Sequence, residues 1–184
     1  MNHRPAEFAS PESDEPNRLE PVVVRLSAGA STELEAIEIE CNSPPWTKKL
    51  FEGEFSNACS RTYGARVAGI VVGFLVVHVV LDEAHIVSFG VRRLLRSRGV
   101  GRTIVAHVLR VLHEEAVRSV VLEVRRSNCV AQELYRSLGF IESGERSAYY
   151  ADNREDAILM NLSMSEFVAR WGMEDLPERQ RSAA

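Results

Sequence analysis

Residues 96–101 read Arg96-Ser97-Arg98-Gly99-Val100-Gly101, and they stand between a β-rich run and a helical pattern. Glycines in such a turn let backbone N–H groups approach an anion, and the first turn of the next helix adds about half a positive charge. The apolar residues that follow fall on one face of a helix. They are Val100, Ile104, Val105, Val108, Leu109 and Leu112. The segment therefore predicts a strand–turn–helix unit whose turn suits a phosphate group.

Two common nucleotide-binding motifs fit this turn poorly. The sequence has no Gly-Lys-Ser/Thr, with which a nucleotide P-loop ends. A dinucleotide fingerprint needs a third glycine where Ile104 stands, although Glu123 lies near the spacing of its acidic residue. A loop that merely needs flexible glycines is the alternative interpretation.

The turn also carries a concentration of positive charge. Its arginines are Arg92, Arg93, Arg96, Arg98 and Arg102. Guanidinium groups match phosphate geometry, so the cluster predicts a clamp for a multiply phosphorylated ligand, with a solvated loop as the alternative. The whole chain has 22 Lys+Arg against 26 Asp+Glu and a net charge of −4. This acidic balance argues against a protein that coats nucleic acid, and we expect no direct nucleic-acid binding.

The rest of the chain alternates strand and helix patterns around this turn. Strands are expected within residues 22–26, 60–65, 68–80, 84–91, 120–124, 140–150 and 156–162. Helices are expected at 47–55, from residue 100 onward and at 128–137, with an earlier one opening at a capping box of Thr32 and Glu35. Gly139 suits the C-terminal cap of the helix expected at 128–137. This order predicts an α/β domain with a mixed sheet.

The length of 184 residues suits one domain. Residues 1–20 are polar and rich in proline, and they are interpreted as a flexible leader. The folded body is expected at 21–162. Residues 163–184 are a C-terminal extension, in which Phe167, Val168 and Trp171 could form an amphipathic stub.

No targeting or membrane segment is visible, because the longest apolar run, Val67–Leu81, is too short for a membrane helix of about 20 residues. The three cysteines form no CxxC pair, so neither a disulfide framework nor a zinc site is expected. His85, His107 and His113 show no metal-ligand spacing and are interpreted as structural or solvated, with no metal expected. These features favour a cytoplasmic protein.

The motifs together resemble a known family. The R-x-x-G-x-G pattern at 96–101 resembles the acetyl-coenzyme A motif of GNAT N-acetyltransferases. The segments VLDEA (80–84), LEVRRSN (122–128), LYRSLGF (134–140), YY (149–150) and REDA (154–157) are similar to those of ribosomal-protein-alanine N-acetyltransferases, the RimI family. The match covers residues 22–162. It implies a GNAT fold, an α/β architecture with a mixed, mostly antiparallel central sheet and helices on both faces.

The resemblance also implies roles for individual residues. Backbone groups that would hold the pantetheine arm of acetyl-CoA are those of Phe89, Gly90 and Val91. Residues that would cradle its pyrophosphate are Ser97, Arg98, Gly99, Val100, Gly101 and Arg102, and Asn128 would also contact the cofactor. Glu123 stands at the family's general-base position and Tyr135 at its general-acid position. Residues expected to line the peptide entrance are Trp46, Tyr149 and Tyr150.

The predicted activity is acetyl transfer from acetyl-CoA to the N-terminal α-amine of a protein, such as a ribosomal protein with N-terminal alanine, by direct attack in a ternary complex. An α-amino group, with a reference pKa of about 7.7–8.0, needs less help from a base than lysine at about 10.4. The alternatives are a lysine or small-amine acetyltransferase and a non-catalytic acyl-CoA-binding module. Arg92-Arg93 replaces the Asp-Pro that relatives commonly carry, so substrate choice is less constrained than cofactor choice.

Overall fold

The computed structural model describes residues 20–172. In chain order its elements are β1 (Val22–Arg25), η1 (Ala28–Ala30), α1 (Ser31–Cys41), α2 (Lys48–Ser56), β2 (Ser60–Val67), β3 (Ile70–Val80), β4 (Glu83–Val91), η2 (Arg93–Leu95), α3 (Val100–Glu114), β5 (Ser119–Arg125), α4 (Cys129–Leu138), β6 (Ile141–Arg146), β7 (Ala157–Ser163) and α5 (Met164–Trp171). The η elements are single 3₁₀ turns.

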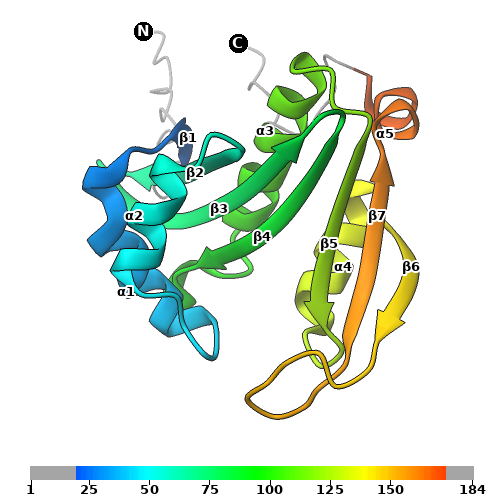
Figure 1. The fold of residues 1–184 in the computed structure, drawn as a ribbon. Helices are drawn as coiled ribbons and strands as arrows, with labels where there is room; N and C mark the ends of the chain where they lie inside the picture. Colours follow the sequence, from blue (N-terminus) through cyan, green and yellow to red (C-terminus); the bar gives the residue numbers. More distant parts are fainter. Residues whose placement is uncertain (1–19, 173–184) are drawn as a thin grey trace, which may run out of the picture.

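The strands form one seven-stranded sheet in the order β1-β2-β3-β4-β5-β7-β6 (Figure 1). The pairings on either side of the centre are antiparallel, whereas β4 and β5 run parallel. A parallel pair needs a crossover connection, and α3 supplies it. The strand–turn–helix unit predicted around Gly99 is thus the crossover at the middle of the sheet.

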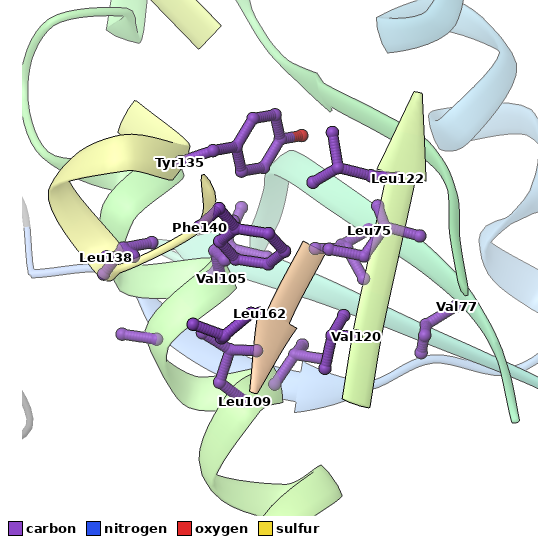
Figure 2. Close-up of a cluster of buried hydrophobic side chains, with 14 of the residues drawn as sticks. Leu75, Val77, Val105, Leu109, Val120, Leu122, Tyr135, Leu138, Phe140 and Leu162 are labelled. Atoms are coloured by element: carbon purple, nitrogen blue, oxygen red, sulfur yellow. The ribbon is translucent and has the colours of Figure 1, made fainter. Parts of the chain in front are cut away.

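Helices cover both faces of the sheet (Figure 1). Neighbouring residues of β3 show the two layers, because side chains alternate between the faces of a strand. Phe74 packs with Phe51 of α2 under the first two helices, while Leu75 joins Leu109 of α3 in the larger core on the other face. Figure 2 shows this larger core, with Val120 of β5 and Leu162 of β7 directed toward α3. The predicted GNAT architecture is confirmed.

The central strands separate at one end. The parallel ladder between β4 and β5 runs from Glu83↔Ser119 to Ile86↔Leu122 and stops there. Val87 has no partner in β3, because the register shifts between Val76↔Ser88 and Val77↔Ile86. Such a bulge bends a strand and increases its twist. Figure 1 shows the two strands diverging beyond this point.

Two details of the strand and helix predictions are wrong. The capping box fails, because α1 begins at Ser31 after Ala30 and no side chain caps it. Glu35 instead accepts a hydrogen bond from Lys48 N at 2.8 Å, which joins α1 to α2. The strand expected over 140–150 ends at Arg146, so Tyr149 and Tyr150 lie in a loop rather than at a strand end.

The folded core continues past Leu162, where the sequence pattern placed the end of the body. α5 follows β7 directly, and Phe167 is 1% exposed within the larger core. Its packing explains why apolar residues occur at 167, 168 and 171 with helical spacing. The leader expected at 1–20 lies outside the described residues except for Glu20, and so does the extension beyond residue 172.

Replacing Phe167 with Ala is expected to lower the free energy of unfolding by about 3–5 kcal/mol, because it leaves a cavity in a filled core. Urea denaturation followed by circular dichroism measures the loss. Glu166→Ala is the control: this exposed neighbour in the same helix should change stability by less than about 0.5 kcal/mol. Equally small effects of both changes would mean that α5 adds nothing to the core.

Candidate active site

A cavity of about 420 Å³ lies where β4 and β5 part. β4 lines it from Ile86 to Phe89, and β5 lines it from Leu122 to Arg125. The end of α1, the loop over 42–46, and α4 supply further walls. Several residues singled out from the sequence line this cavity: Trp46, Phe89, Glu123, Asn128, Tyr135 and Tyr150. The structure therefore brings together side chains from segments more than 100 residues apart.

Gly90, Val91 and Tyr149 were also predicted as site residues, but they do not line this cavity. Gly90 and Val91 lie on the end of β4 beyond the last pairing with β5 that the described chain contains. The Val91 carbonyl already accepts hydrogen bonds from Cys41 Sγ (3.4 Å) and Arg96 Nε (3.0 Å). Tyr149 is 44% exposed, and its ring packs edge-on against Tyr150 at 5.2 Å between centroids.

The predicted phosphate turn has the backbone geometry that anion binding requires. Gly99 is left-handed, with φ +85°, and Ser97 is also left-handed at φ +57°. The first hydrogen bond of α3 runs from Thr103 N to Gly99 O at 3.0 Å. The amides of the first turn, Val100 to Arg102, therefore have no carbonyl partner within the helix and are available to an anion.

Three arginines of the cluster bind protein groups, which the sequence interpretation of a five-arginine clamp did not foresee. Arg92 Nη1 binds Glu40 Oε1 at 2.8 Å, and Arg96 binds the Glu40 carbonyl at 3.2 Å. These two arginines tie the loop to α1. Arg102 Nη1 donates to Ser137 Oγ at 2.7 Å. Arg93 and Arg98 are exposed and, within residues 20–172, their side chains make none of the observed contacts. Arg98 stands directly before the left-handed Gly99, so it is the cluster member best placed to meet a ligand at that turn.

Glu123 is held from two sides at the cavity wall. Its side chain is 10% exposed. Oε1 lies 3.2 Å from Arg146 Nη1, and Oε2 lies 2.5 Å from His85 Nε2. The interpretation of His85 as merely structural or solvated is therefore incomplete. No local sequence signal marks this contact, because it depends on the alignment of β4 with β5.

Tyr135 is buried between aromatic rings, with Phe140 at 5.4 Å and Phe89 at 6.4 Å between centroids. Figure 2 shows its hydroxyl directed toward Leu122 of β5. Burial, reinforced by Tyr150, raises the pKa of the Tyr135 phenol well above its usual value of 10. The hydroxyl therefore stays protonated at neutral pH.

Arg125 joins two loops at the mouth of the cavity, a role that the sequence did not indicate. Its guanidinium binds Asp152 at 2.9 Å and Glu155 at 3.1 Å. It also donates to the Ser43 carbonyl at 2.5 Å and lies 3.9 Å from the centre of the Tyr150 ring. The loop over 42–46 and the loop over 147–156 are therefore fastened to the end of β5.

A second carboxyl lines the cavity opposite β5. Glu38 of α1 is 1% exposed and accepts hydrogen bonds from Asn42 Nδ2 (2.7 Å), Trp46 N (3.4 Å) and Ser88 Oγ (3.4 Å). Burial raises the pKa of Glu38 despite these bonds. Its partners hold the loop that carries Trp46 against β4, so Trp46 owes its place at the cavity to this group.

Residues 31–140 match the acetyltransferase (GNAT) family. The chain belongs to that family. This match covers the crossover turn, both cavity strands and α4, and it ends before β6 and the loop that carries Tyr150. The prediction of an acetyltransferase is confirmed.

Individual GNAT proteins resemble this chain over most of its length. This GNAT chain is 37% identical over 147 residues to ribosomal protein bS18-alanine N-acetyltransferase of Escherichia coli (strain K12), covering 76% of this chain and 97% of that protein. The crystal structure of the ribosomal-protein-S18-alanine N-acetyltransferase from Escherichia coli has a TM-score of 0.73 at 32% identity, over 78% of this chain and 94% of that one. The resemblance noted in the sequence is confirmed.

PaiA N-acetyltransferase from Thermoplasma acidophilum, solved in complex with coenzyme A, shares the fold at 15% identity. Its TM-score is 0.65, over 78% of this chain and 98% of that one. Among residues 20–172, no helix is both long and apolar enough to cross a membrane, and no group of three or more His, Cys, Asp or Glu is arranged to hold a metal ion.

Glu155→Gln is expected to destabilise the fold in a pH-dependent way. Hydrogen bonds from Ser127, with smaller contributions from Asn153 and Arg125, lower the pKa of Glu155 from 4.5 to about 2. A carboxyl whose pKa is lower in the folded state stabilises that state above its unfolded pKa, and the contribution is lost as pH falls toward the folded pKa. The stability difference from wild type should therefore be largest above pH 4.5 and shrink toward pH 2.

Urea midpoints at pH 7 and pH 3 measure this difference. Glu133→Gln, an exposed carboxyl on α4, is the control and should show little difference at either pH. A Glu155→Gln effect that is the same at both pH values would contradict the proposed ionic fastening of the loop.

Proposed function

We propose that this protein transfers the acetyl group of acetyl-CoA to the N-terminal α-amine of a protein, a ribosomal protein with N-terminal alanine or a similar N-terminus. The observation that carries the proposal is that Glu123 and Tyr135 line the same cavity. They come from β5 and α4 and supply an acceptor and a donor of protons to one reaction centre. The similarity to an enzyme named for bS18 alanine supports the choice of acceptor.

The residues present fit acetyl-CoA. The left-handed Gly99 turn and the free first-turn amides of α3 suit the pyrophosphate, with Arg98 beside them. Beyond Ile86, the edge of β4 that faces β5 has no strand partner and offers backbone groups to the pantetheine arm, as a free sheet edge does to an extended ligand. When bound, acetyl-CoA supplies the acetyl group as a thioester. Cavity residues Phe89 and Asn128 would adjoin its reactive end.

Glu123 takes a proton from the amine in this proposal. A nitrogen attacks a carbonyl only with a free lone pair, and an α-amino group has a reference pKa of about 7.7–8.0. The base therefore has a modest task at neutral pH. Glu123 is suited to it because His85 and Arg146 fix its carboxylate while two further lone-pair positions remain for the amine or an intervening water.

Tyr135 gives a proton to the leaving sulfur. The buried phenol is protonated at neutral pH, so its proton is available when thiolate charge develops beside it. The apolar surroundings of Phe89 and Phe140 make an uncompensated thiolate costly there, so a donor at this position favours departure of the thiol. Attack by the amine is direct, in a ternary complex, and needs no acyl-enzyme.

The acceptor peptide enters between the two loops that Arg125 fastens. Trp46 stands on one loop, and Tyr149 and Tyr150 stand on the other. Aromatic side chains supply contact area at low entropic cost, which suits a flexible N-terminus. A cytoplasmic location remains a prediction that accompanies this substrate.

The acceptor is tested with acetyl-CoA and peptides whose first residue varies, together with peptides whose N-terminus is blocked but whose lysines are free. Mass spectrometry locates the acetyl group. Product on the N-terminal amine of Ala- or similar peptides is expected. Product on lysines alone would overturn the proposal in favour of a lysine acetyltransferase, and binding without product would favour a non-catalytic acyl-CoA-binding module.

Glu123→Gln and Tyr135→Phe are each expected to lower kcat by about 100-fold or more, the usual loss when a general base or acid is removed. Affinity for acetyl-CoA should change little, because both side chains line a cavity whose wall does not include residues 96–102 of the phosphate turn. Steady-state kinetics and calorimetry measure the two effects. Wild-type turnover in either variant would remove that residue from the mechanism.

Arg98→Ala is expected to raise KM for acetyl-CoA by several-fold, about 1 kcal/mol for one exposed charge-assisted phosphate contact, with kcat unchanged. Arg118→Ala is the matched control, because Arg118 is 84% exposed and pairs with Asp82 away from the cavity. Equal KM values for both variants would show that Arg98 does not contact the phosphates.

A further inference from the structure

His85 and Glu123 share a short hydrogen bond across the parting strands. His85 lies on β4 opposite Val121 of β5, one step before the ladder ends at Ile86↔Leu122. Glu123 is two residues beyond Val121, so it points to the same face of the sheet. The distance from His85 Nε2 to Glu123 Oε2 is 2.5 Å.

The two side chains of this hydrogen bond differ in their exposure to solvent. The Glu123 side chain is 10% exposed, whereas that of His85 is 39% exposed. Glu123 lines the cavity and His85 does not. The imidazole therefore stands between the carboxylate at the cavity and the solvent beyond it.

A second pair of a histidine and a glutamate, His78 and Glu54, provides a comparison for His85 and Glu123. His78 of β3 lies directly opposite His85, and its Nε2 is 2.7 Å from Glu54 Oε2 of α2. The Glu54 and His78 side chains are 17% and 31% exposed, but neither residue lines the cavity. The titratable and charged groups around His85 and Glu123 include His78 with Glu54, Arg146 of β6, and Tyr150 with Arg125 at the mouth of the cavity.

We propose that His85 is a positioning residue for Glu123 and the route by which the proton taken from the amine reaches solvent. This rests on the proposed function of the site. An imidazole can accept a proton at one nitrogen and release one from the other near neutral pH, which a carboxylate with Arg146 alone cannot do. The bond to Nε2 also fixes the orientation of the carboxylate toward the cavity.

The protons balance as follows. An ammonium acceptor gives one proton to Glu123, and that proton passes through Nε2 of His85 to solvent. The amine nitrogen then forms a bond to the acyl carbon and the C–S bond breaks. Tyr135 gives its proton to sulfur, and Glu123 takes the second proton from nitrogen. That proton leaves through His85 as the first did, and one proton from solvent restores the Tyr135 phenol. One proton is released per acetyl group transferred from an ammonium acceptor.

The test uses His85→Gln, His85→Ala and the matched control His78→Ala in the full chain. Glutamine can donate to Glu123 but cannot carry a proton. His85→Gln is therefore expected to lower kcat about tenfold, less than loss of the base itself, with the peptide KM within about twofold of wild type. His85→Ala should lose at least as much and regain activity when imidazole is added, because the site opens to solvent. His78→Ala should keep wild-type kcat and show no response to imidazole.

A spectroscopic readout is independent of turnover. In ¹⁵N-histidine-labelled protein, Glu123→Gln should change the ring nitrogen shifts of His85 while those of His78 stay unchanged. Unchanged His85 shifts would overturn the pairing itself.

The outcomes separate this inference from the proposed function. Acetyl product on lysines alone would overturn the N-terminal acceptor, and the His85 variants would then be measured with that lysine peptide. Wild-type kcat in His85→Gln would overturn the proton route, as would loss in His85→Ala without imidazole rescue. Absence of any transfer by the wild-type protein would overturn both.

Discussion

The end of the parallel pairing between β4 and β5 is the constraint on which the site depends. Hydrogen bonds hold the strands together as far as Ile86↔Leu122, and the β4 bulge at Val87 lies just beyond. Past that point each strand presents an unpaired edge, which in a closed sheet would be filled by its neighbour. The cavity, the free edge of β4 and the position of the Glu123 carboxylate all follow from this separation. The crossover through α3 places the Gly99 turn at the same end.

Charge in this protein is organised locally rather than by its net value. The arginine-rich loop is strongly basic in sequence, yet Arg92 and Arg96 are turned inward to Glu40 and the end of α1. They stiffen the wall of the cavity, and the backbone amides of α3 with Arg98 remain for phosphate. At the mouth of the cavity, Arg125 likewise forms ion pairs within the protein, with Asp152 and Glu155. Most of these arginines shape the site instead of contacting a ligand.

Local patterns predicted local structure well. Gly139 caps α4 at φ +106° as expected, and Asn128 caps its start by accepting from Ala131 N. Contacts across the sheet were missed, including those of His85 and Arg125. The partner of His85 lies 38 residues away and is brought to it by strand register, whereas the partners of Arg125 lie 27 to 82 residues away on loops that pack against the end of β5. A capping box was expected at Thr32, but tertiary packing used Glu35 to hold α2 instead.

The sequence by itself determined the alternation of strands and helices, the glycine turn before α3 and the segments that mark a GNAT acetyltransferase. These depend on periodicity, backbone freedom and short-range capping, which act over a few residues. The tertiary structure alone decided which arginines are free, how Glu38 holds Trp46, and that His85 meets Glu123. Those outcomes depend on contacts between elements that are separate in the chain, and the meeting of His85 with Glu123 depends in particular on the parallel ladder and on where it stops.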